Sequence, residues 1–246
     1  MSFFRHVTFD LDDTLLDTSG GLIPIAARRA MEVIVREKTT DLSIREAMIE
    51  ALMIRRTAIL REQPRAEVWT SLADGNAVLG EAARQIFLRP PLENIPAGTV
   101  RLTDGAFELL KWTKGNSTLH LVTSGDSAVQ TEKINRLGIG DFFETIQIVE
   151  ARPSLPNGKG PKYEAFLRTR EKYSDVPAKS FLSIGNRVDT DLGEAKLLDW
   201  RTVWIRHGEH AHLAPAKPSE IPDFEVATPS ELLSIWRQQF QERITP

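Results

Sequence analysis

The chain has 246 residues, of which 41% are hydrophobic and 26% are charged, and its formal net charge is −3. This length is enough for a real hydrophobic core, in one large domain or two small ones. A slightly acidic chain offers no broadly basic surface, so we expect no nucleic-acid partner. Because cysteine is absent, disulfides, zinc–thiolate sites and a cysteine nucleophile are all excluded.

Neither a secretory leader nor a membrane anchor is expected from the sequence. The chain opens without a charged segment followed by an apolar one. Nowhere do about eighteen apolar residues run together, which is the length that a membrane-spanning helix needs. We therefore predict no membrane partner and a cytoplasmic location, which the absence of cysteine also suits.

The segment His6–Thr14, HVTFDLDDT, predicts a buried strand that runs into three carboxylates. In an extended chain Asp10 and Asp12 point to the same side, about 7 Å apart along the strand. This spacing suits a hard cation such as Mg²⁺, or a substrate between a nucleophile and an acid/base. One aspartate after a strand would simply cap a turn, but three of them, with Asp13, indicate a site. A calcium-binding EF-hand is excluded because its twelfth position would be Gly21 rather than Glu.

The stretch after this strand predicts helices. Its apolar residues recur three or four positions apart, and Ser43 with Glu46 has the capping-box pattern of a helix start. The predicted helices run from Pro24, over Ser43–Leu60, and over Trp69–Phe87 with a break near Asp74-Gly75. Such an excursion is too long for a crossover loop, so we expect residues 18–97 to form an inserted helical domain.

Beyond Pro96, strands and helices alternate, which predicts an α/β protein with a doubly wound parallel sheet. The predicted helices are Asp104–Lys114, Ser127–Leu137, Pro161–Tyr173, Leu192–Leu198 and Ser230–Phe240. The predicted strands, after the first one, are Thr118–Thr123, Thr145–Val149, Ser180–Ile184 and Thr202–Ile205. In such sheets, ligands bind beyond the carboxyl ends of the strands, around a topological switch point.

Polar residues gather where these strands end. Thr123–Asp126 (TSGD) follows the second strand, and a hydroxyl beside backbone N–H groups suits a phosphate oxygen as well as a plain helix cap. Gly185–Asp191 (GNRVDTD) follows the fourth strand. After the fifth strand, three histidines lack the regular spacing of metal ligands, so we expect a solvated loop there. They are His207, His210 and His212.

The sequence Asp10-Leu11-Asp12-Asp13-Thr14 resembles the first motif of the haloacid dehalogenase (HAD) superfamily. Within it, the chain looks like the subfamily of phosphoglycolate phosphatases and haloacid dehalogenases that carry a helical C1 cap. The resemblance implies a Rossmann-like α/β core made of residues 1–17 and 98–246. It also implies that the inserted α-helical domain of residues 18–97 is a cap that closes over the site and selects the substrate.

The resemblance also implies roles for residues of the first two motifs. In this superfamily the first aspartate attacks phosphorus, and the aspartate two residues later is the general acid/base. By position these are Asp10 and Asp12. The second motif is an apolar strand that ends in threonine or serine, which gives Thr123 the phosphate-binding role. Ser124 stands where asparagine is commoner in the family.

The third and fourth motifs leave alternatives open. The third is a lysine near the start of the helix before the fourth strand, and two lysines are candidates for it. Lys162 has a family-like separation from the fourth motif and is slightly favoured. Lys159 has the more usual local context. In the fourth motif, Asn186 replaces the acid that normally ligates the metal, and Asp191 matches the distal acid. An amide oxygen carries no charge, so Asn186 predicts weaker Mg²⁺ binding, or compensation by Asp189 or Asp191. The implied Mg²⁺ ligands are Asp10, the Asp12 carbonyl, Asn186 and, through water, Asp191.

The function predicted from these motifs is Mg²⁺-dependent hydrolysis of a small phosphate monoester through an aspartyl-phosphate. A haloacid dehalogenase shares the fold but needs no metal, and Asp12 with Asp13 argues against it. A phosphomutase of the β-phosphoglucomutase type would carry the same motifs. A non-catalytic HAD-fold binding protein is favoured by Asn186 and opposed by intact Asp10 and Asp12. The expected partner is a small phosphorylated metabolite, and the chain is expected to be a monomer or a homodimer.

Overall fold

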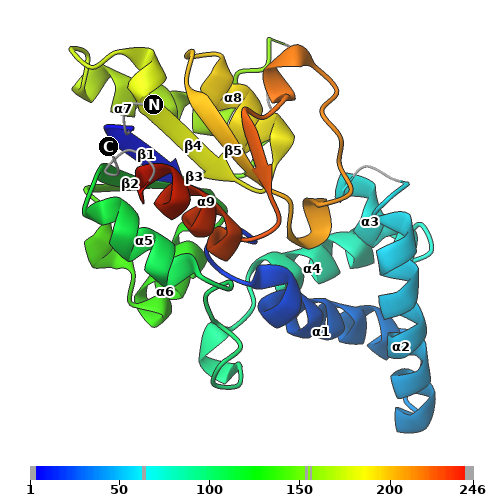
Figure 1. Ribbon diagram of the computed structural model, residues 1–246. Helices are drawn as coiled ribbons and strands as arrows, with labels where there is room; N and C mark the ends of the chain where they lie inside the picture. Colours follow the sequence, from blue (N-terminus) through cyan, green and yellow to red (C-terminus); the bar gives the residue numbers. More distant parts are fainter. Residues whose placement is uncertain (1–3, 63–64, 153–154, 156, 242–246) are drawn as a thin grey trace. The chain divides into compact units, whose positions relative to one another are not determined.

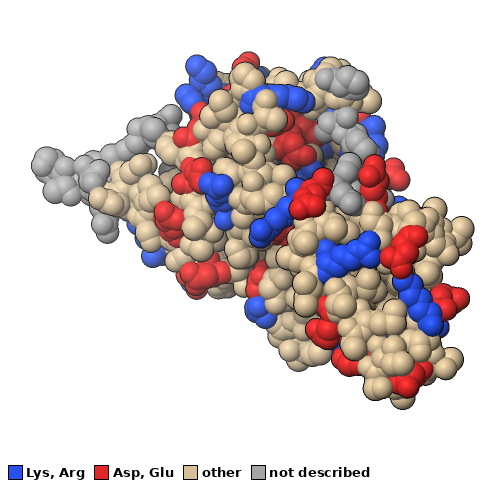
Figure 2. Space-filling model, turned by 90° about the vertical axis from the view of Figure 1, so that its right-hand side faces the viewer, with Lys and Arg blue, Asp and Glu red and all other residues tan. Residues whose placement is uncertain are grey.

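In the computed structural model, residues 4–62, 65–152, 155 and 157–241 are described. The chain divides into two compact units, one formed by residues up to Ser19 together with those from Val100 onward, and the other by Gly20–Thr99. Within the described ranges, each helix is too short or too polar to cross a lipid bilayer. Figure 2 shows lysine and arginine side chains interspersed with aspartate and glutamate on the face that it presents.

The first unit is built on a six-stranded parallel sheet in the order β3-β2-β1-β4-β5-β6. The strands are β1 (His6–Phe9), β2 (Thr118–Ser124), β3 (Thr145–Val149), β4 (Phe181–Gly185), β5 (Arg201–Ile205) and β6 (Phe224–Val226). The predicted fold class is confirmed. Strand β6 was not predicted, because three residues are too few to show an alternation. It forms by pairing with β5, with Val203 opposite Phe224.

Two layers of helices cover this sheet. The helices are α5 (Ala106–Lys114), α6 (Ser127–Leu137), α7 (Pro161–Lys172), α8 (Gly193–Lys196) and α9 (Pro229–Gln241). In Figure 1, α5, α6 and α9 lie on one face, and α7 and α8 lie on the other. Beneath α7 and α8, an apolar cluster that includes Val122, Phe166 and Trp200 is almost wholly buried. Burial of these side chains is what holds the helices onto the sheet.

The topological switch point lies at β1 and β4. The chain runs outward from β1 through β2 to β3, and then returns to β4 on the other side of β1. Phe9 pairs with Ile184, and the N–H of Asp10 donates to the carbonyl of Ile184 at 2.9 Å. Asp10 and Asn186 therefore begin the two segments that leave the sheet at the edge where doubly wound proteins bind their ligands.

The second unit is a helical bundle made of α1 (Ile23–Arg36), α2 (Leu42–Ile59), α3 (Arg65–Leu72) and α4 (Ala77–Leu88). It has its own apolar core, to which Met31, Ile34, Leu52, Trp69 and Ala83 belong. The capping box predicted at Ser43 is wrong, because Asp41 is the N-cap and accepts the N–H groups of Ser43 and Ile44. An aspartate caps a helix at least as well as a serine, so the helix begins earlier.

Candidate active site

The turn after β1 separates the three carboxylates of the first motif. Asp13 has a φ of +56°, in the left-handed region, and its N–H donates to the carbonyl of Leu16 at 2.7 Å. Its two carboxylate oxygens accept the N–H and the hydroxyl of Ser19, each at 2.6 Å. Asp13 therefore stabilises the turn, while Asp10 and Asp12 contact other polar groups of the first unit.

Asp10 faces a buried lysine and a second buried carboxylate. The Nζ of Lys162 lies 2.6 Å from Oδ1 of Asp10 and 2.6 Å from Oδ1 of Asp191. The exposed fractions of the three side chains are 5% for Lys162, 9% for Asp10 and 2% for Asp191. A single cation thus bridges two carboxylates that water barely reaches.

The protonation of Asp10 is shifted by this environment. Burial and, to a smaller extent, the nearby Asp191 raise its pKa to about 7, against the opposing effect of Lys162. Burial also disfavours the charge of Lys162, but the two carboxylates raise the pKa of Lys162 above its ordinary value. The lysine therefore stays charged between the two carboxyl groups.

Of the two candidate lysines, the structure brings only Lys162 to Asp10. It lies in the first turn of α7, which begins at Pro161. The first turn is fixed by the fully buried Glu194, whose carboxylate accepts the N–H of Tyr163 at 2.5 Å. Lys159 is exposed in the preceding loop, with its Nζ 4.7 Å from the centre of the Tyr163 ring.

Asp12 is held by donors that the sequence analysis did not identify. Oδ1 accepts from the hydroxyl of Thr18 at 2.6 Å and from Nζ of Lys133 at 2.7 Å, and Oδ2 accepts from Nε2 of Gln130 at 2.8 Å. Burial alone would raise the pKa of Asp12, but Lys133 and these hydrogen bonds lower it overall. Gln130 and Lys133 lie three residues apart in α6 and so share one helix face, but two polar residues at this spacing usually face solvent, so the sequence carried no signal that they are buried.

The second motif ends β2 beside the same glutamine. Thr123 is fully buried, and its Oγ1 lies 2.7 Å from Nε2 of Gln130. The same nitrogen lies 3.1 Å from the carbonyl oxygen of Ser124. The predicted pair Thr123 and Ser124 therefore lies next to Asp12, linked to it through Gln130.

The two acidic residues of the fourth motif, which follows β4, have different partners. Asp189 pairs with the guanidinium of Arg187, whereas Oδ2 of Asp191 accepts the N–H of Arg187 at 2.9 Å and Oδ1 accepts from Lys162. A Cβ on Gly185 would lie 2.3 Å from Oδ2 of Asp191, so only glycine fits at that position. Of the two acids that were expected to compensate for Asn186, Asp191 is the one beside Asp10.

The oxygen donors at this site fit Mg²⁺. Asn186 is buried at the end of β4, with its Nδ2 3.4 Å from the carbonyl of His207. The donor set of Asp10, the Asp12 carbonyl and the Asn186 amide consists of oxygens, which Mg²⁺ prefers. The Lys162 ammonium faces the two carboxylates of Asp10 and Asp191, so a further cation would be accommodated favourably beside them.

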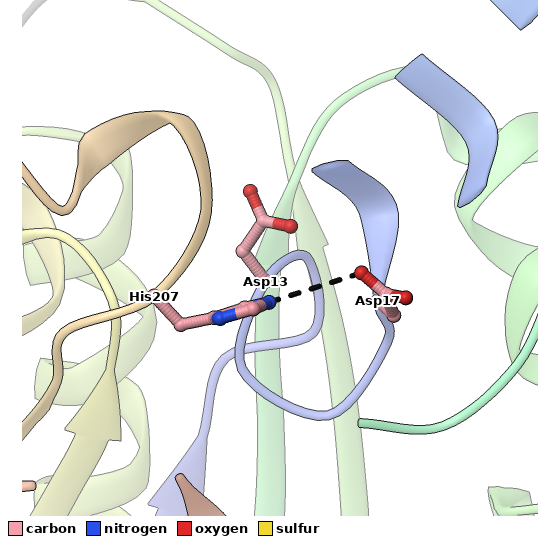
Figure 3. Close-up of side chains that lie close together, drawn as sticks. All are labelled: Asp13, Asp17 and His207. Atoms are coloured by element: carbon pink, nitrogen blue, oxygen red, sulfur yellow. Dashed lines mark ion pairs between the residues drawn. The ribbon is translucent and has the colours of Figure 1, made fainter. Parts of the chain in front are cut away.

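A separate cluster joins the turn after β1 to the loop after β5 (Figure 3). One ligand-type atom from each of Asp13, Asp17 and His207 lies within 4.8 Å of the other two, and His207 Nε2 is 3.8 Å from Oδ1 of Asp17. These carboxylates already have partners, since Asp13 accepts from Ser19 and Asp17 pairs with Arg101. We therefore read the cluster as a link between two loops. The solvated loop expected around the histidines is only partly correct, because His210 is buried.

Residues 4–199 match the family of haloacid dehalogenase-like hydrolases, and the chain therefore belongs to this family. It is 29% identical over 245 residues to a glyceraldehyde 3-phosphate phosphatase of Methanopyrus kandleri, covering 95% of this chain and 97% of that protein. It is 25% identical over 254 residues to the glyceraldehyde 3-phosphate phosphatase of Pyrococcus furiosus, covering 97% and 95% of the two chains.

Solved structures share the fold over nearly the whole chain. A predicted phosphoglycolate phosphatase from Haemophilus somnus has a TM-score of 0.65 at 18% identity, covering 96% of this chain and 99% of that one. YfnB from Bacillus subtilis, solved with magnesium bound, has a TM-score of 0.59 at 21% identity, covering 95% and 98%. The resemblance to the HAD superfamily is thus confirmed, and the chain is a HAD-like hydrolase with phosphatase relatives.

Proposed function

We propose that this HAD-like hydrolase is a Mg²⁺-dependent phosphatase that hydrolyses a small phosphate monoester through an aspartyl-phosphate on Asp10. The observation that carries the proposal is the buried arrangement in which Lys162 bridges Asp10 and Asp191 while Asp12 lies beside Thr123. A nucleophile, an acid/base and donors for phosphoryl oxygens are the parts that this chemistry requires.

In the first step, a carboxylate oxygen of Asp10 forms a bond to phosphorus and the ester P–O bond breaks. The hydrogen bonds to Asp12 lower its pKa, so Asp12 first takes up a proton from solvent and then gives that proton to the departing oxygen. Thr123 and Lys162 donate to the phosphoryl oxygens and stabilise their charge. In the second step, Asp12 takes a proton from water as that water attacks phosphorus, which releases phosphate and restores Asp10.

Asp10, the Asp12 carbonyl and Asn186 are the residues that would hold Mg²⁺, with Asp191 assisting through water. Bound there, the ion would supply positive charge that keeps Asp10 ionised and offsets charge on the phosphoryl group. This need is specific to the site, because burial raises the pKa of Asp10 to about 7 even with Lys162 beside it.

The relatives suggest the substrate class. Several similar proteins are named glyceraldehyde 3-phosphate phosphatases, so we propose a small sugar phosphate or related phosphorylated metabolite. The helical unit Gly20–Thr99 stands in the chain where the family resemblance implies a substrate-selecting cap, and that role is part of the proposal.

The test is release of inorganic phosphate from a panel of sugar, nucleotide and aryl phosphates, with and without Mg²⁺. We expect metal-dependent release by the wild type, loss of it in Asp10→Asn, and acid-stable trapping of phosphate on the wild-type chain. If Asn186→Asp is active while the wild type is silent, the natural protein is a weakened or repurposed HAD-like hydrolase. Silence of all three proteins would refute the phosphatase proposal.

A further inference from the structure

We propose that Gln130 and Lys133, both in α6, are positioning residues for the carboxylate of Asp12. We further propose that Gln130 sets Asp12 and Thr123 in one fixed arrangement. The inference rests on the proposed phosphatase function, since it concerns the acid/base of that reaction. It assigns a task to two buried polar side chains that the proposed chemistry has not so far used.

Lys133 is nearly buried, although lysine is seldom found inside a protein without a partner. Its side chain is 10% exposed, and its Nζ lies 2.7 Å from Oδ1 of Asp12. Asp12 comes from the turn after β1, so the ion pair joins α6 to a segment more than a hundred positions earlier in the chain. An ammonium group at this distance fixes the direction of the carboxylate through a charge-assisted hydrogen bond.

Gln130 is more constrained still, because its side-chain nitrogen has two hydrogens and three oxygen neighbours. Nε2 lies 2.8 Å from Oδ2 of Asp12, 2.7 Å from Oγ1 of Thr123 and 3.1 Å from the carbonyl oxygen of Ser124. The carboxylate and the carbonyl can only accept, which fixes the amide with its nitrogen toward them. A flipped amide would set its oxygen against both acceptors.

This orientation determines what Thr123 can do. An amide nitrogen does not accept hydrogen bonds, so the Thr123 hydroxyl cannot donate to Nε2 and keeps its own proton for another acceptor. A phosphoryl oxygen is such an acceptor in the proposed reaction. The Oε1 of Gln130 is buried without a hydrogen-bond partner in the described part of the chain. A glutamine held with one unsatisfied oxygen indicates that its nitrogen contacts decide its orientation.

The consequence concerns the leaving group. An alkoxide is a poor leaving group and needs a proton from Asp12 in the transition state, whereas a 4-nitrophenolate leaves without one. A variant that misplaces Asp12 should therefore slow phosphoryl transfer from an alkyl phosphate far more than transfer from 4-nitrophenyl phosphate. A variant that only loosens the structure should slow both by the same factor.

The experiment measures the first turnover, with rapid mixing and acid quench, as the amount of phosphate bound covalently to the protein. It compares glycerol phosphate with 4-nitrophenyl phosphate at saturating Mg²⁺, because the second step needs Asp12 for both substrates and would hide the difference. The variants are Lys133→Met and Gln130→Leu, with Lys133→Arg as the conservative replacement. The matched control is Arg136→Met, on the same helix, whose guanidinium pairs only with the exposed Glu132 among the described contacts.

We expect Lys133→Met and Gln130→Leu to lower transfer from glycerol phosphate on the order of 100-fold and transfer from 4-nitrophenyl phosphate less than about threefold. Lys133→Arg should restore most of the wild-type ratio of the glycerol phosphate rate to the 4-nitrophenyl phosphate rate. Arg136→Met should leave both rates unchanged. Equal losses with both substrates, or no loss, would overturn the inference while the phosphatase function stands. A wild type that forms no metal-dependent phosphoprotein would overturn the proposed function and this inference together. Thermal melting of each variant identifies any that fails to fold, and the folded one of Lys133→Met and Gln130→Leu then decides the outcome.

Discussion

Replacement of Lys162 by methionine tests the central charge arrangement of the site. Methionine keeps the length and apolar stem of lysine but removes the ammonium that lies 2.6 Å from both Asp10 and Asp191. Two buried carboxylates then remain without a cation between them. Breaking a buried ion pair by removing one partner destabilises a protein by about 3–5 kcal/mol, and the low exposure of all three side chains places this pair in that class.

The destabilisation caused by Lys162→Met should depend on pH. Burial raises the pKa of Asp10 from 3.8 to about 7 while Lys162 opposes the rise. Since the folded pKa lies above the unfolded one, the stability that this group contributes is present at low pH and is lost as the pH rises through 7. Without Lys162 the pKa of Asp10 rises further. The free energy of unfolding of the variant should therefore lie furthest below that of the wild type near pH 8. The difference should be smaller at pH 5, where Asp10 is neutral.

Urea unfolding at pH 5 and pH 8 in metal-free buffer measures this difference, and phosphate release measures the chemistry. The loss of one charged donor to the phosphoryl group should lower turnover on the order of 100- to 1,000-fold. Lys159→Met is the matched control, because Lys159 is exposed and contacts the Tyr163 ring rather than Asp10. It should change the free energy of unfolding by less than about 0.5 kcal/mol.

A free energy of unfolding of Lys162→Met within about 0.5 kcal/mol of the wild-type value at both pH values would contradict this charge arrangement. Loss of phosphate release in Lys159→Met, but not in Lys162→Met, would contradict it equally. Either result would mean that the buried lysine does not balance Asp10 and Asp191 in solution.

Three further predictions concern other parts of the first unit. His120 is buried beside His6, and burial lowers its pKa from 6.5 to about 4. The free energy of unfolding should therefore fall on the order of 3 kcal/mol as the pH drops from 6.5 to 4. Urea titrations should show that this pH dependence is absent in His120→Asn. Gly185→Ala would place a Cβ 2.3 Å from Oδ2 of Asp191, so we expect thermal melting to show a loss of about 1–3 kcal/mol. Asn186→Asp adds a charged oxygen ligand, so calorimetric titration should show Mg²⁺ binding at least about tenfold tighter, and chelation should reverse the gain.

The order of strands and helices could be predicted from the sequence because hydrophobic periodicity is a local property. The strand-end motifs followed from the same pattern. Since the carboxyl ends of parallel strands share one edge of a sheet, the residues after β1, β2 and β4 had to converge. Asp10, Thr123 and Asp191 were placed on this basis, and the structure brings each of them to that edge. The three-residue β6 escaped because its pairing with β5, and not its own composition, makes it a strand.

Other features depended on contacts between segments far apart in the chain. Lys159 and Lys162 differ by only three positions, and the start of α7 decides which of them reaches Asp10. The left-handed backbone at Asp13 turns that carboxylate toward Ser19, which alternation along a strand cannot foresee. Gln130 forms its hydrogen bonds with residues from the turn after β1 and from the end of β2. Motif spacing thus predicted which residues lie together at this edge of the sheet. The direction of each side chain was decided by packing, because hydrogen bonds between distant segments form only in the folded chain.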